Sequence, residues 1–92
     1  MFKSGDIIDI KMSQGEFIGR VGYFGGNCIE IKEIVNVQIR DGSTQAQFIS
    51  LKSDLVFYGN MVVMKLTEQH PYYKTYKQAI SGIILPGNIG FN

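Results

Sequence analysis

Apolar and polar residues alternate along most of the first two thirds of the chain, as they do in a β-strand with one buried face. The pattern is clearest over residues 28–40, where the alternation continues with two interruptions to the end of the segment. The other segments of this kind are residues 7–12, 17–24, 44–58 and 61–66. We therefore expect five strands, the fourth of them interrupted at residues 52–54.

Glycine and asparagine recur between these segments. Both residues adopt the positive φ angles that tight hairpin turns require. The predicted turns are residues 13–15, 25–27, 41–42 and 59–60. Such short connections predict an antiparallel meander, because parallel strands need much longer crossovers.

Two glycines, Gly19 and Gly22, lie inside the second predicted strand. Glycine weakens a strand interior by about 0.5–1 kcal/mol relative to alanine. It is favoured where a strand bends sharply or where another backbone passes close by. Because a flat sheet of this length would leave two open edges and one wet face, we expect a small, strongly bent, five-stranded antiparallel barrel, an all-β fold.

The pattern changes to helical spacing after the fifth strand. His70 and Pro71 suit a helix start, because proline is tolerated in the first helical turn. The apolar residues at helical spacing are Tyr73, Tyr76, Ile80 and Ile84. We predict a short helix near residues 71–81 that completes a single domain over residues 1–85, followed by a flexible tail at residues 86–92.

Charge and composition exclude several classes of function. The net charge is +1, so nucleic-acid binding would need a local site or a repeated subunit. Cys28 is the single cysteine, and no apolar run approaches the ~20 residues of a membrane helix. No metal-ligand spacing or phosphate-binding loop is present, and a pair of Cys28 with His70 lacks an orienting third group. We expect a soluble cytoplasmic protein that is not an enzyme, carries no metal or other cofactor and does not bind membranes.

Three segments resemble the Sm and Sm-like family. Residues 17–24 read F-x-G-x-V-x-Y-F, which is similar to the family's first signature. Asn27 precedes an apolar strand, as the family's loop asparagine does, and LVFYGNMVVMKL at residues 55–66 is similar to the second signature. The resemblance covers residues 6–66 and implies a bent barrel of the Sm-like, SH3-like type.

The resemblance also implies a homo-oligomeric ring of about five to seven subunits, in which the fourth strand of one copy pairs with the fifth of the next. The fifth predicted strand has almost no charge, and such an edge is an aggregation hazard unless it is paired. The interface residues implied are Phe48, Ile49, Leu55, Phe57, Met61, Val62, Val63 and Met64.

Two loops near the pore of such a ring would bind single-stranded RNA or DNA. The residues implied are Phe24, Gly25, Gly26, Asn27, Tyr58, Gly59 and Asn60. Aromatic rings stack on bases with about 1–3 kcal/mol each, and an asparagine amide can both donate to and accept from a base edge. The alternatives are a core position for Phe24, a subunit interface for Tyr58, and turn chemistry for Asn27 and Asn60.

A second function is compatible with the same barrel. Tyr58 stands where the family carries a basic residue, and Gly25 stands where it carries an aspartate. The missing basic residue at Tyr58, the low net charge and the apolar C-terminal tail favour a structural or assembly module that oligomerises or docks a protein partner without binding RNA.

Overall fold

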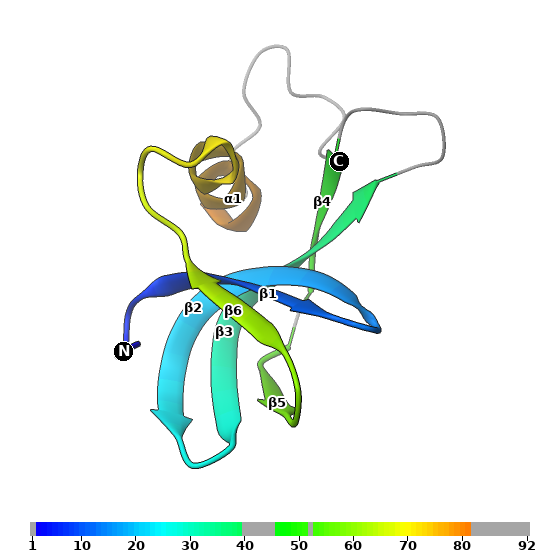
Figure 1. Cartoon of the computed structure of the whole chain (residues 1–92). Coiled ribbons are helices and arrows are strands. Elements are labelled where there is room, and N and C mark those ends of the chain that lie inside the picture. The colour runs from blue at the N-terminus through cyan, green and yellow to red at the C-terminus, as the bar shows by residue number, and fades with distance from the viewer. Residues whose placement is uncertain (1, 40–45, 52, 82–92) are drawn as a thin grey trace.

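The computed structural model describes residues 2–39, 46–51 and 53–81, which form a curled antiparallel sheet and one helix (Figure 1). The elements are β1 (Ile7–Met12), β2 (Gly15–Gly25), β3 (Cys28–Ile39), β4 (Ala46–Ser50), β5 (Leu55–Tyr58), β6 (Val62–Lys65) and α1 (Pro71–Ser81). The prediction of a mainly β fold with a short helix near residues 71–81 is confirmed.

The predicted fourth strand is two strands. Residues Val35–Ile39 of β3 pair with β4, whereas residues Cys28–Ile31 pair with β5. The chain leaves the β3 ladder between Ser50 and Leu55 and rejoins it further along, where the sequence predicted an interruption. The sheet therefore has six strands, and the prediction of five is wrong because this break divides the fourth strand.

The prediction of a closed barrel is also wrong. The strand order is β4-β3-β2-β1-β6, with β5 beside a second part of β3. Within the described residues β6 pairs with β1 alone, and neither β4 nor β5 pairs with it. Phe57 of β5 and Val63 of β6 nevertheless belong to the same apolar cluster, so side chains, without a ladder of hydrogen bonds, fill the space between these edges.

The predicted bend at Gly19 and Gly22 is confirmed. The register between β2 and β3 shifts between Ile18 and Arg20 and again between Val21 and Tyr23. A Cβ atom on Gly19 would overlap the Cγ2 of Ile31, so the lack of a side chain lets β3 cross closely. The two glycines are thus the points at which β2 curls around the core.

A bulge in β3 faces the first of these shifts. Glu33 has a φ of 52°, and the next two residues, Ile34 and Val35, are both buried. The Tyr76 hydroxyl of α1 donates a hydrogen bond of 2.8 Å to the Glu33 carbonyl, and Arg20 forms an ion pair with the Glu33 carboxylate. The bulge therefore serves as the docking point of the helix.

The core consists of two clusters on opposite faces of the sheet. The concave face holds Ile8, Ile10, Val21, Ile29, Ile31, Ile34 and Phe57. The face beneath α1 holds Ile7, Ile18, Val35, Val37, Phe48, Leu66 and Tyr76. Because both faces are covered, the strands near the centre of the sheet are buried on two sides.

The helix begins as predicted. Pro71 is its first residue, and the His70 Nδ1 accepts a hydrogen bond of 3.0 Å from the Tyr72 backbone N–H. This bond caps a backbone donor that has no partner within the helix. The predicted turn at residues 41–42, Lys52 of the interruption and the predicted tail at residues 86–92 lie outside the described residues.

Candidate functional site

Two turns that are distant in sequence meet at one end of the sheet. The turn between β2 and β3 contains Gly26, with a φ of 58°, and the turn between β5 and β6 contains Gly59, with a φ of 84°. The β3–β5 ladder joins them, because Cys28 pairs directly with Tyr58. Both turns depend on glycine, since L-residues with side chains rarely adopt these angles.

A cavity of about 160 Å³ lies between these turns. Its lining residues are Phe24, Gly26, Asn27, Cys28, Ile29, Gly59, Met61 and Val63. Four residues predicted for nucleic-acid binding line this one cavity: Phe24, Gly26, Asn27 and Gly59. The fold thus brings together parts of both loops that the sequence analysis had selected.

The lining also includes residues that the sequence analysis did not select for binding. Ile29 and Cys28 follow the first turn, and Met61 and Val63, predicted for the subunit interface, follow the second. The Cys28 thiol donates to the Gly25 carbonyl at 3.5 Å. The strand alternation places Ile29 inward, but only the folded chain shows that it borders a cavity together with Met61 and Val63.

Phe24 supplies the aromatic wall. Its ring makes an edge-to-face contact with Phe2, with ring centroids 5.7 Å apart and an interplanar angle of 85°. The residue nevertheless keeps 37% of its surface exposed. Packing against Phe2 therefore holds the ring in place and leaves part of it accessible to a ligand.

Three of the predicted binding residues, Gly25, Tyr58 and Asn60, do not line the cavity. Tyr58 is 65% exposed and alternates with the buried Phe57, so it faces away from the concave side. A Cβ atom on Gly25 would lie 2.7 Å from the Tyr23 hydroxyl, which places that exposed ring beside Gly25. Tyr23 was not selected from the sequence, although its alternation with Phe24 could have indicated an outward ring.

The cavity lining carries no lysine or arginine. A ligand there would contact apolar side chains, one amide and the backbone of the glycine turns. Such a surface suits a flat, uncharged group with hydrogen-bonding edges, because it gives apolar contact on one side and a donor and an acceptor on another. A phosphate group would find no cation within the cavity itself.

The residues predicted for a subunit interface divide into three groups. Phe48 and Phe57 are buried in the two clusters of this chain. Leu55, Met61 and Val63 are half-buried. Ile49, Val62 and Met64 are exposed by 42%, 68% and 44% on edge strands. Since β4, β5 and β6 each have one neighbouring strand among the described residues, their outer backbone groups are available for pairing.

The described part of the chain shows neither a metal-binding cluster nor a membrane-spanning helix. It contains no group of three or more histidine, cysteine, aspartate or glutamate residues arranged to hold a metal ion. Its one helix, α1, is too short and too polar to span a membrane.

Comparison of the chain with models of protein families, with curated proteins and with solved structures gave no match. The described residues form a small, mainly β fold with an open, curled six-stranded sheet, one helix on its outer face and a small cavity between two glycine turns.

Proposed function

We propose that this chain is a non-catalytic, Sm-like protein that binds single-stranded nucleic acid, most naturally RNA, with one base in the cavity between the two turns. The observation that carries the proposal is the meeting of Phe24 and Asn27 with Gly59 around one cavity. These residues come from the two loops that the resemblance to Sm-like proteins implied for binding.

The chemistry of the cavity suits a base. Ligand sites for drug-sized molecules usually enclose roughly 300–1,000 Å³, so a cavity of about 160 Å³ has room for one small ring system. The Phe24 ring offers a stacking surface, and the Asn27 amide offers a donor and an acceptor for a base edge. The glycines on both sides of the cavity allow the nucleic-acid backbone to approach the protein closely.

Assembly into a ring would supply the affinity that one site lacks. With a net charge of +1 and no cation in the lining, one copy gains little from phosphate contacts. Repeating the site around a ring converts weak binding into avidity. Pairing of β6 with β4 or β5 of a neighbouring copy would also satisfy the edges that are open in the single chain.

The test is fluorescence anisotropy of short U-rich and A-rich oligonucleotides at about 50 and 200 mM salt. Asn27→Ala should weaken binding about tenfold, because a hydrogen-bonding group in the cavity is lost. Asn60→Ala is the matched control, since Asn60 lies in the second turn but does not line the cavity. The proposal fails if neither oligonucleotide binds at low salt or if both variants bind equally well.

A second candidate function is an assembly module that docks a protein and does not bind RNA. The exposed apolar residues of the edge strands favour it, notably Ile49, Val62 and Met64, as does the lack of cations around the cavity. In that case the purified chain would oligomerise, but the anisotropy of both oligonucleotides would not change when it is added.

A further inference from the structure

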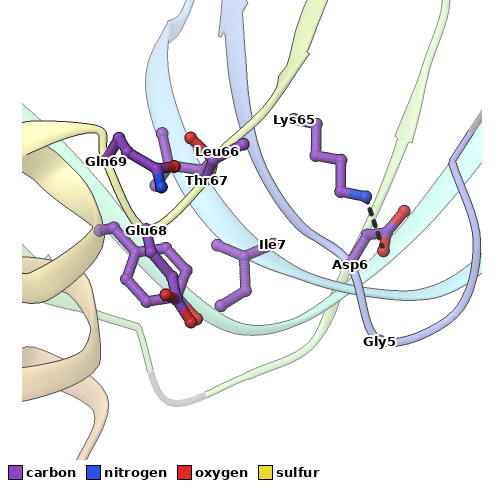
Figure 2. A pocket seen from close by; sticks show the side chains of 9 residues that line it. Gly5, Asp6, Ile7, Lys65, Leu66, Thr67, Glu68 and Gln69 are labelled. Carbon is purple, nitrogen blue, oxygen red and sulfur yellow. Dashed lines mark ion pairs between the residues drawn. The ribbon is translucent and has the colours of Figure 1, made fainter.

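A second and larger cavity lies where the start of β1, the end of β6 and the link to α1 meet (Figure 2). Its volume is about 370 Å³. The lining residues are Gly5, Asp6, Ile7, Lys65, Leu66, Thr67, Glu68, Gln69 and Tyr73. It shares no residue with the cavity between the two turns, so its role can be tested independently of the proposed function.

The floor of this cavity is apolar. Ile7 is 9% exposed and Leu66 is 2% exposed, and both belong to the cluster beneath α1. Tyr73 is half-buried and packs against the same cluster. An aliphatic chain lying on this floor would therefore contact side chains that the core already holds in place.

The rim is acidic, and Figure 2 shows the carboxylates of Asp6 and Glu68 on either side of Ile7. The Asp6 side chain is only 10% exposed, and its Oδ2 accepts a hydrogen bond of 3.1 Å from the Lys3 backbone N–H. The Asp6 backbone is also fixed, because its carbonyl accepts a hydrogen bond of 2.8 Å from the Val21 N–H. This carboxylate is thus held in position before any ligand arrives.

Lys65 neutralises the carboxylates at the rim only in part. The Lys65 Nζ lies 3.7 Å from the Asp6 Oδ1, and the Lys65 side chain is 55% exposed. Glu68 is exposed and forms no ion pair with any described residue. Two carboxylates and one ammonium group leave the lining with a net charge of minus one, which attracts a monovalent cation and repels phosphate.

We propose that this cavity binds an arginine side chain of a peptide. The aliphatic stem of arginine can lie on Ile7 and Leu66 while its charged head remains at the rim. There the planar guanidinium can donate two parallel hydrogen bonds to the Glu68 carboxylate, which forms no ion pair with a described residue, and this geometry suits arginine better than lysine. Tyr73 adds an aromatic surface that attracts the same cation.

The probe is N-acetyl-arginine amide, titrated into the isotope-labelled chain and followed by the NMR shifts of its backbone amides. Binding should be weak, about 1 mM, and should move the amides of residues 5–7 and 66–69. The matching citrulline amide has nearly the same shape without the charge, and it should leave these amides unmoved.

Two substitutions should act in opposite directions. Glu68→Gln should weaken binding of the arginine probe about tenfold, because it removes one charged partner. Lys65→Met should strengthen binding several-fold, because it removes a cation that repels the guanidinium and that partly neutralises the Asp6 carboxylate. Glu30→Gln lies outside this cavity and serves as the control that leaves the affinity unchanged.

Citrulline amide that binds as well as the arginine probe would overturn the proposal, as would a Lys65→Met variant that binds more weakly. Neither result would affect the oligonucleotide experiment, since the two cavities have no residue in common.

Discussion

Asp9 is the single buried charged residue among the described residues, with 2% of its surface exposed. It lies within β1, whose first four residues are all buried, and its Oδ1 has no hydrogen-bond partner. Burial raises the pKa of this carboxyl to about 7, and a hydrogen bond with Glu16 and repulsion from that carboxyl add to the rise, whereas Lys11 opposes it. The folded protein therefore favours a neutral Asp9 up to about neutral pH.

We predict that Asp9→Asn stabilises the protein at pH 8 by about 2–4 kcal/mol. The folded pKa of Asp9 is raised from 3.8 to about 7, so the unfolded chain loses this proton at lower pH than the folded one. The free energy of unfolding should fall as the pH rises from about 4 to 7 and then level off. Urea denaturation of the parent and the variant at several pH values measures the difference.

The stabilisation by Asp9→Asn should vanish below about pH 3, where the carboxyl is neutral in both the folded and the unfolded parent. Asp54→Asn is the control, because Asp54 is exposed and its loss of charge changes no buried group. An Asp9→Asn variant that is less stable than the parent at pH 8 would show that Asp9 stabilises the fold as a charged group.

The sequence placed Asp9 on the polar face of its strand, opposite Ile8 and Ile10. That assignment of faces is correct, but the polar face is buried as well, next to Ile7. Alternation identifies which residues share a face of a strand. It does not show whether a later element covers that face, as α1 does where its Tyr76 packs in one cluster with Ile7.

At the scale of elements, the strands and turns follow from alternation and from glycine positions. β1 and α1 coincide with the predicted segments, and the turns at Gly26 and Gly59 are where they were expected. The bulge at Glu33 could be seen only as a break in the alternation. Whether Glu33 or Ile34 leaves the ladder depends on the β2 residues that pair with β3 and on the Tyr76 hydroxyl that bonds to the Glu33 carbonyl. Both contacts are distant in sequence.

Gly19 and Gly22, the two glycines inside β2, should respond differently to alanine. A methyl group on Gly19 would overlap the buried Ile31 and lie 3.1 Å from the Lys32 carbonyl, so Gly19→Ala should destabilise the protein by about 1–3 kcal/mol. A methyl group on Gly22 would meet the side-chain ends of Glu30 and Lys32 at 2.7 and 2.9 Å. These ends can move, so Gly22→Ala should change stability by less than about 1 kcal/mol.

Thermal unfolding followed by circular dichroism compares the two variants directly. Each carries the same substitution in the same strand, so the difference in helix and strand propensity cancels between them. Equal losses of stability would mean that the close crossing of β3 over Gly19 does not hold in solution.

At the scale of the whole molecule, the sequence predicted the strand segments but wrongly predicted that the sheet closes into a barrel. Closure requires β6 to pair with β4 or β5. The separation of these edge strands depends on the combined bends at Gly19, Gly22 and Glu33. The candidate site shares this limit. The family resemblance implied its two loops and their residue chemistry supported them, whereas Ile29, Met61 and the shape of the cavity depend on how far the sheet curls.

The open edges lead to a prediction about mass in solution. If β6 pairs with β4 or β5 of a neighbour, light scattering after size exclusion should give about five to seven times the chain mass of 10.3 kDa. Val62→Glu should reduce it to 10.3 kDa, because a charge on an edge strand opposes pairing. Val62 is 68% exposed and faces Lys11 across the β1–β6 ladder, so glutamate there should leave the single chain folded.

Gln14→Glu adds the same charge at the exposed β1–β2 turn, away from β4, β5 and β6, and should leave the mass of the assembly unchanged. This control separates an effect at the edge strand from a general effect of net charge on association. A parent chain that elutes at 10.3 kDa at its highest soluble concentration would contradict the ring. The base-binding cavity would then have to act as a single weak site, because avidity requires several copies in one assembly.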